Sequence, residues 1–211
     1  MSNEIKQRIC GVDFDNTIVS YDDVLASIAR QRGLVDASEA GSKRKIRDRI
    51  RQLPEGEIEW QKCQALIYGA CIDQARLSDG VAEFFHVCAQ HGVKVYIISH
   101  KTESSRFDAV TNLRQAAMDW MTRQGFFETN GLDLRESDVF FADSRQEKAS
   151  TIASLRCTHF IDDLEETFLE ETFPQGTARI LYDPARDEPA PAGITVMKSW
   201  KDICEHLFAA D

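Results

Sequence analysis

Short apolar runs alternate along this chain with longer segments that have the periodicity of helices. The runs cover residues 9–12, 93–98, 138–143, 158–161 and 178–182, with a further strand candidate at 194–197. Strands that alternate with helices are typical of a parallel sheet covered by helices on both faces. We therefore predict a Rossmann-like, three-layer α/β/α core with a mainly parallel sheet, and the 211 residues suffice for such a core with a small insert.

The segment 19–77 has a different pattern, without a convincing strand. Three sets of apolar residues recur there at helical spacing: Val24, Leu25 and Ile28; Ile46, Ile50 and Leu53; and Trp60, Cys63, Leu66, Ile67 and Ala70. Gly33 and the Pro-Glu-Gly sequence at 54–56 separate these sets. We expect a small all-helical domain at 19–77, inserted after the first strand, and a core formed by 1–18 and 78–211.

A strongly basic run, Lys-Arg-Lys-Ile-Arg-Asp-Arg-Ile-Arg, occupies residues 43–51 of this insert. It is either a solvated helix face or a source of cations that attract an anionic substrate, and the sequence leaves both interpretations open.

After the second strand, apolar residues from Phe107 to Met121 recur on a helical period. This spacing predicts one long helix that includes both Phe107 and Met121.

The composition limits the classes of partner. A net charge of −10 argues against binding to a nucleic-acid backbone. The six cysteines are scattered without a Cys-x-x-Cys pair, which is typical of free thiols in a reducing compartment. The sequence shows neither an apolar targeting run at its start nor a stretch of membrane-spanning length. We expect a cytoplasmic protein that does not bind membranes.

Acidic residues follow two of the predicted strands. The first strand runs into Asp13-Phe14-Asp15-Asn16-Thr17, and the strand at 158–161 ends in Asp162-Asp163. Ligands of open parallel sheets bind at the carboxyl ends of the strands, where neighbouring carboxylates repel unless a cation lies between them. Magnesium with oxygen ligands is the simplest such cation, although an Asp/Asn-rich turn has the same letters.

Other polar residues follow the strand at 93–98. Ser99 comes directly after it and is followed by His100 and Lys101. His100 and Lys101 either line the mouth of a pocket or belong to a polar loop. Together with Asn16 they are our candidate substrate-binding residues.

These motifs, in this order, resemble those of the haloacid dehalogenase-like (HAD) superfamily. Asp13, Asp15 and Thr17 match its first motif, Ser99 its second, Lys148 its third, and the Asp162-Asp163 pair its fourth. The resemblance covers roughly residues 8–18 and 78–183, and it implies that the helical insert is a small cap domain of the C1 type. Motif four lacks the family's usual glycine-aspartate pairing, and Lys101 competes with Lys148 for the lysine of motif three.

The resemblance implies a role for each matching residue. Asp13 would attack phosphorus and form an aspartyl-phosphate, and Asp15 would act as general acid and then general base. Thr17 and Ser99 would bind the phosphoryl oxygens, and Lys148 would neutralise the nucleophile and the transferred group. Mg²⁺ would be held by Asp13, by the backbone carbonyl of Asp15, and by Asp162 and Asp163, with Asp163 favoured as the direct ligand.

The acid at position 15 and the threonine at position 17 resemble the phosphatases of the superfamily more than its dehalogenases, since a halide leaves without a proton. We predict a phosphoric monoester hydrolase that acts on a small phosphorylated metabolite, as a monomer or homodimer. The alternatives are a phosphomutase with the same residues, or a non-catalytic module that binds a phosphorylated ligand or a protein.

Overall fold

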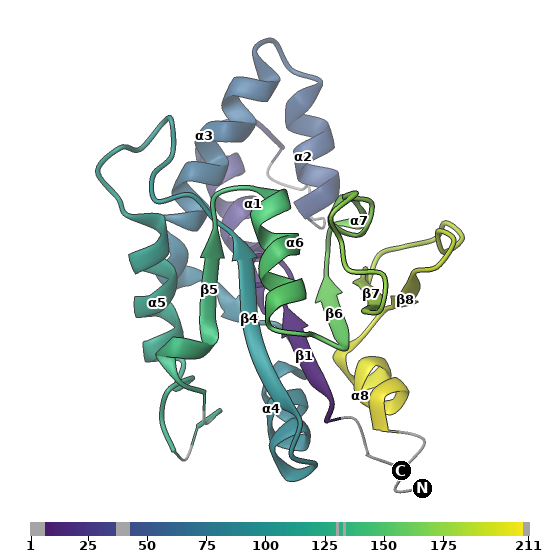
Figure 1. The fold of residues 1–211 in the computed structure, drawn as a ribbon. Coiled ribbons are helices and arrows are strands. Elements are labelled where there is room, and N and C mark those ends of the chain that lie inside the picture. Colours follow the sequence, from purple (N-terminus) through teal and green to yellow (C-terminus); the bar gives the residue numbers. More distant parts are fainter. Residues whose placement is uncertain (1–6, 37–42, 130, 133, 209–211) are drawn as a thin grey trace, which may run out of the picture. The chain divides into compact units, whose positions relative to one another are not determined.

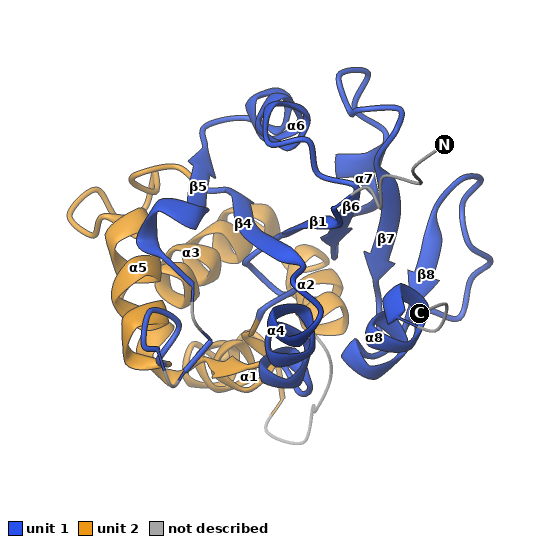
Figure 2. Cartoon of the chain, turned by 60° about the horizontal axis from the view of Figure 1, so that its bottom comes forward, with its two compact units in different colours: residues 1–18, 78–101, 125–211 blue, residues 19–77, 102–124 orange. Residues whose placement is uncertain are grey.

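The computed structural model describes residues 7–36, 43–129, 131, 132 and 134–208, and the chain forms two compact units. The first contains Met1–Ile18, Ser78–Lys101 and Gly125–Asp211, and the second contains Val19–Leu77 and Thr102–Gln124 (Figure 2). Within the described ranges, no helix is both long and apolar enough to cross a membrane.

A six-stranded sheet forms the centre of the first unit (Figure 1). Its strands, in spatial order, are β5 (Val139–Ala142), β4 (Lys94–His100), β1 (Ile9–Val12), β6 (His159–Asp162), β7 (Ala178–Tyr182) and β8 (Thr195–Met197). Every neighbouring pair is parallel. The predicted parallel α/β core is confirmed, and β1 lies in the interior of the sheet between β4 and β6.

Helices cover both faces of this sheet. Helix α6 (Arg145–Ser154) packs on β4 and β5, whereas α4 (Val81–Gln90) contacts β4 and α8 (Trp200–Phe208). Figure 2 shows α6 on one side of the sheet and α4 and α8 on the other. The short helices η2 (Glu136–Asp138) and α7 (Glu165–Phe168) connect strands. The result is the expected three-layer arrangement.

An apolar cluster lies between α6, the strands β4, β6 and β7, and the segments that flank β6 and β8. Its buried members are Ile98, Ile152, Cys157, Phe160, Phe168, Phe173, Leu181 and Ile194. Gly11 on β1 is required by this packing, because a Cβ atom there would lie 2.6 Å from the ring of Phe160. The close approach holds the start of the Asp13 loop against β6.

The second unit is mainly helical. It contains α1 (Asp22–Gln31), α2 (Lys43–Arg51), α3 (Gly56–Tyr68), η1 (Ile72–Gln74) and α5 (Leu113–Arg123). It also contains a short antiparallel pair, β2 (Val19–Ser20) with β3 (Arg76–Leu77), which the sequence pattern did not indicate. The pair lies where the chain leaves and re-enters the first unit in sequence. The segment 102–124, which we expected in the core, belongs to this unit.

The predicted long helix through Phe107 and Val110 is wrong in its first part. Helix α5 begins only at Leu113, with the Asn112 side chain accepting a hydrogen bond from the Gln115 amide. Upstream, the Asp108 carboxylate accepts hydrogen bonds from the amides of Val110 and Thr111 and so stabilises a turn. Val110 is 96% exposed. Local side-chain capping outweighs the apolar periodicity here, as is common for Asp and Asn.

The basic run forms α2 as an amphipathic helix. Ile46 and Ile50 are buried, and two of the cations pair with acids: Arg47 with Asp48 at 2.8 Å and Arg51 with Glu57 at 2.7 Å. Lys43 donates to the hydroxyl of Tyr68. These pairs are what a solvated helix face would make.

Candidate functional site

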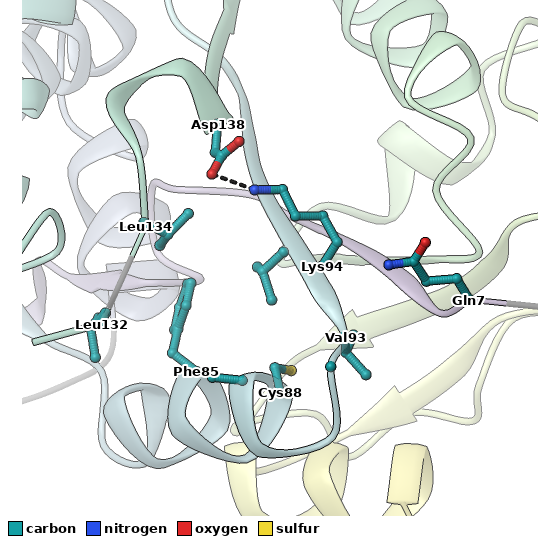
Figure 3. Close-up of a pocket in the computed structure, with 11 residues that line it drawn as sticks. Gln7, Phe85, Cys88, Val93, Lys94, Leu132, Leu134 and Asp138 are labelled. Atoms are coloured by element: carbon teal, nitrogen blue, oxygen red, sulfur yellow. Dashed lines mark hydrogen bonds and ion pairs between the residues drawn. The ribbon is translucent and has the colours of Figure 1, made fainter. Parts of the chain in front are cut away.

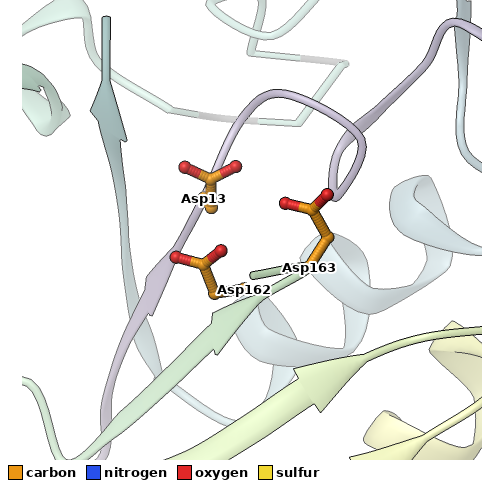
Figure 4. A group of neighbouring side chains, drawn as sticks. All are labelled: Asp13, Asp162 and Asp163. Atoms are coloured by element: carbon orange, nitrogen blue, oxygen red, sulfur yellow. The ribbon is translucent and has the colours of Figure 1, made fainter. Parts of the chain in front are cut away.

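Two neighbouring strands bring the acidic residues together. Asp13 follows β1 directly and Asp162 ends β6, and these two strands are paired in register at Val12 and Ile161. The amide of Asp13 donates to the carbonyl of Ile161 at 2.9 Å, so the pairing continues to the first carboxylate. One carboxylate oxygen from each of Asp13, Asp162 and Asp163 lies within 4.8 Å of the other two (Figure 4).

The three carboxylates have different surroundings. Asp13 and Asp162 are buried, and Asp163 is only partly buried. One oxygen of Asp162 accepts from the amide of Leu164 at 2.9 Å, and the other accepts from Lys148. Asp162 is therefore anchored by the protein on both oxygens.

A buried lysine joins two of these acids. Lys148 lies in the first turn of α6, whose start is set by the Ser144 side chain accepting from the Glu147 amide. Its ammonium group is 2.6 Å from an oxygen of Asp13 and 2.6 Å from an oxygen of Asp162. Of the two candidate lysines, Lys148 is thus the one that contacts Asp13.

The electrostatics of this cluster follow from its burial. Desolvation raises the pKa of Asp13 from 3.8 to about 7, against the lowering effect of Lys148 and together with repulsion from Asp162 and Asp15. Burial by itself would lower the pKa of Lys148, but the two carboxylates outweigh it and raise that pKa. The cluster contains three carboxyl groups and one ammonium group, an excess of acidic groups that a bound cation would offset.

Two buried hydroxyl groups complete the site. Thr17 and Ser99 are 0% and 1% exposed, and neither Oγ has a hydrogen-bond partner among the described residues. Thr17 belongs to the loop after β1, and Ser99 to the end of β4 beside it. A buried hydroxyl without a partner costs free energy. Two such hydroxyls, at neighbouring strand ends, are available to donate hydrogen bonds to oxygen atoms of a ligand.

Asp15 has a lysine of its own. Its carboxylate oxygens lie 2.9 and 3.1 Å from the ammonium group of Lys101, which follows the end of β4. The sequence suggested Lys101 as a substrate-binding residue or as an alternative to Lys148, but gave no sign of this contact. Its position two residues after Ser99 was the only available signal.

The remaining predicted residues lie around this cluster. Asn16, partly buried, has a left-handed backbone with φ of 65°, which asparagine tolerates better than most residues. His100 is at the exposed end of β4, and desolvation lowers the pKa of its ring. The structure thus places the predicted residues at the strand ends, the adjoining loops and the start of α6, all at one edge of the sheet, and their roles stay predictions.

A cavity of about 290 Å³ lies at the opposite end of β4 (Figure 3). Phe85, Cys88 and Leu134 contribute apolar surface to it. Its charged side chains, Lys94 and Asp138, form an ion pair with each other. Because this pair is satisfied internally, we assign the functional site to the carboxyl ends of the strands.

No family model and no curated protein matches the sequence. Solved structures do match. A HAD family hydrolase from Deinococcus radiodurans with bound phosphate and sodium is 14% identical, with a TM-score of 0.57 and 97% of this chain and 96% of that chain covered. The HAD-hydrolase YfnB from Bacillus subtilis, bound to magnesium, is 12% identical and has a TM-score of 0.56. The match covers 95% of this chain and 98% of that chain. A dehalogenase is 12% identical and has a TM-score of 0.58, and the match covers 98% of this chain and 99% of that chain. At these identities the comparison shows the fold, which is that of HAD-superfamily hydrolases.

Proposed function

We propose that this protein is a magnesium-dependent phosphatase that hydrolyses a small phosphorylated metabolite through an aspartyl-phosphate on Asp13. The observation that carries the proposal is the cluster in which Lys148 binds Asp13 and Asp162 while Asp163 lies within reach of both. The proposal is also consistent with the phosphate and the magnesium named for two structures of the same fold.

The carboxylates would hold the metal ion. Asp13 and Asp163 are the proposed side-chain ligands, and Asp162, whose two oxygens also accept hydrogen bonds from Lys148 and Leu164, would reach the ion directly or through water. Asp162 would in addition hold Lys148 in place and add negative charge. The backbone carbonyl of Asp15 is a further proposed ligand. When bound, Mg²⁺ would offset the charge of the phosphoryl oxygens beside the carboxylates.

The first half of the reaction would take place at Asp13. Its free carboxylate oxygen would attack phosphorus in line, the bond from phosphorus to the ester oxygen would break, and Asp15 would give that oxygen a proton. Lys148 would remain on the other oxygen of Asp13 and limit repulsion between the nucleophile and the phosphoryl group.

The second half would release phosphate. Asp15, now ionised, would take a proton from a water molecule as that water attacks phosphorus, and the bond between Asp13 and phosphorus would break. Thr17 and Ser99 would donate hydrogen bonds to the phosphoryl oxygens in both halves, which would satisfy the two hydroxyls that lack partners in the described protein.

Asp15 favours phosphate over halide chemistry. A carbon–halogen bond breaks without protonation of the leaving group, whereas an alkoxide leaving group gains from a general acid, typically by about 10²–10⁴-fold. Asp15 is only partly buried and lies two residues after the proposed nucleophile, as this role needs. The proposal therefore predicts no release of chloride from chloroacetate.

The test is phosphate release from 4-nitrophenyl phosphate with and without added Mg²⁺. We expect metal-dependent turnover by the wild type, a loss of at least about 10³-fold in Asp13→Asn, and no change in the matched control Asp202→Asn on the exposed face of α8. Full turnover by Asp13→Asn would remove Asp13 from its role.

A second measurement separates an enzyme from a binding module. Beryllofluoride with Mg²⁺ mimics an acyl-phosphate and should raise the melting temperature of the wild type but not that of Asp13→Asn.

We propose in addition that the helical segment 19–77 acts as a cap that selects the substrate. Exchange of its surface residues should then change substrate preference while 4-nitrophenyl phosphate turnover is kept.

A further inference from the structure

The first unit contains a second buried lysine beside the site, and its partner is a different acid. Lys101 is 4% exposed, and its ammonium group lies 2.9 Å from one oxygen of Asp15 and 3.1 Å from the other. The contact with both oxygens restricts rotation of the carboxylate. The Asp15 side chain keeps 14% of its surface exposed, so one side of it stays accessible.

The backbone of Lys101 is held independently of Asp15, and its ammonium group lies near an aromatic ring. Its amide donates to the carbonyl of Ala142 at 3.0 Å, which extends the pairing of β4 with β5 by one residue. Its ammonium group lies 5.6 Å from the centre of the Phe14 ring, and Phe14 is fully buried. Lys101 thus reaches Asp15 from a hydrogen-bonded strand end, with its ammonium group at a favourable cation–π distance from the Phe14 ring.

The two buried lysines contact different acids of the site. Lys148 from α6 contacts Asp13 and Asp162, and Lys101 from the end of β4 contacts Asp15. The proposed nucleophile and the proposed proton donor are thus oriented by separate cations on separate elements. A change at one lysine should affect one chemical role more than the other.

We infer that Lys101 is a positioning residue that holds the carboxylate of Asp15 in the orientation from which it reaches the leaving-group oxygen. The inference rests on the proposed function, since it concerns how Asp15 serves the same reaction. The mechanism is geometric: a carboxylate that loses both contacts can rotate away, and misplacement by about 1 Å can cost about 10²-fold in rate.

The consequence depends on the leaving group. Nitrophenolate is a stable anion and leaves with little help from a proton donor, whereas an alkoxide needs one. Loss of Lys101 should therefore reduce hydrolysis of an alkyl phosphate far more than hydrolysis of an aryl phosphate. Damage to the nucleophile or to the metal site would reduce both, because every substrate uses them.

The experiment compares kcat/KM for glycerol 2-phosphate and 4-nitrophenyl phosphate, because kcat/KM reports the first half of the reaction. We expect Lys101→Met to lower the alkyl value relative to the aryl value by about tenfold or more, as Asp15→Asn should. Lys101→Gln, which retains a donor, should recover part of the loss. The double variant Lys101→Met/Asp15→Asn should show no further change in the ratio beyond Asp15→Asn.

The outcomes are distinguishable. If the wild type releases phosphate but Lys101→Met and Lys101→Gln lower both substrates equally, the inference is wrong and the proposed function stands. If the wild type hydrolyses neither substrate, both are wrong. Stabilisation by beryllofluoride with Mg²⁺ should persist in Lys101→Met, because Asp13 and Lys148 are unchanged, and its loss would also contradict the inference. If Lys101→Met does not fold, the ratio in Lys101→Gln decides.

Discussion

The ammonium group of Lys148 lies 2.6 Å from Asp13 and 2.6 Å from Asp162, so one buried cation joins the ends of two adjacent strands. These two carboxylates share a single ammonium group, and the carboxylate of Asp163 lies nearby, so acidic groups outnumber basic ones in the cluster. This imbalance has consequences for stability that can be measured without knowledge of the substrate.

Removal of Lys148 should destabilise the protein. Lys148→Met would leave Asp13 and Asp162 buried without their cation, which typically costs about 3–5 kcal/mol. We expect that loss in urea unfolding at pH 8 and a smaller loss at pH 5, where Asp13 can take up a proton. The double variant Lys148→Met/Asp13→Asn removes one of the two buried carboxylates that lack a cation, so it should be more stable than Lys148→Met. An equal loss at both pH values would contradict this account.

The stability of the metal-free protein should fall as the pH rises from about 4 to about 7. The pKa of Asp13 is raised from 3.8 to about 7, so in this window the native state holds a proton that the unfolded state has released. The unfolded state then binds fewer protons, and the free energy of unfolding decreases with pH until about 7, where this contribution is lost. The measurement is urea unfolding in the presence of a chelator across this range.

Asp13→Asn is the control for the pH experiment, since it removes the titrating group and should show a flatter profile than the wild type. Magnesium should oppose the decrease. The ion binds the deprotonated carboxylate, so its stabilising effect should grow with pH up to about 7 and then level off. A wild-type profile that matches that of Asp13→Asn would show that Asp13 has an ordinary pKa.

The two hydroxyls without partners should be dispensable for stability but not for activity. In Thr17→Val and Ser99→Ala we expect a free energy of unfolding that is unchanged or higher by about 1 kcal/mol, because a buried group without a hydrogen bond is removed. We expect kcat/KM for 4-nitrophenyl phosphate to fall by about 10²-fold, as for the loss of one transition-state donor.

Thr177 provides a matched control. Its hydroxyl is buried and donates to the carbonyl of Cys157 at 2.7 Å. Thr177→Val should therefore lose about 1–2 kcal/mol of stability and keep full activity, the reverse of Thr17→Val. If both threonine variants lost stability alike, the hydroxyl of Thr17 would have a structural partner.

Gly11 should not accept a side chain without cost. A Cβ atom there would lie 2.6 Å from the Phe160 ring and 3.1 Å from the Cys157 sulfur. We expect Gly11→Ala to lower the free energy of unfolding by about 1–3 kcal/mol. In a Phe160→Leu background the added cost should be smaller, which a double-mutant cycle measures. Equal costs in both backgrounds would mean that the strain arises elsewhere.

Several features followed from the sequence because they depend on local pattern. Alternating strands and helices determine a parallel sheet, and a parallel sheet collects the carboxyl ends of its strands at one edge. The sequence therefore led us to expect that Asp13 lies near Asp162 and Asp163, although these residues are 149 and 150 positions further along the chain. The start of α5 could not, because apolar spacing does not reveal that Asp108 and Asn112 cap turns at that point.

Only the tertiary structure decided which cation serves which acid. Lys101 and Lys148 each follow a strand, and sequence spacing is the same kind of evidence for both. The structure places Lys148 against Asp13 and Lys101 against Asp15 because a side chain's partner depends on strand order and on the face from which its element approaches. The sequence was enough to predict which polar groups gather at this edge of the sheet, because most of them directly follow a predicted strand. Their pairing is set by long-range packing, which no local pattern encodes.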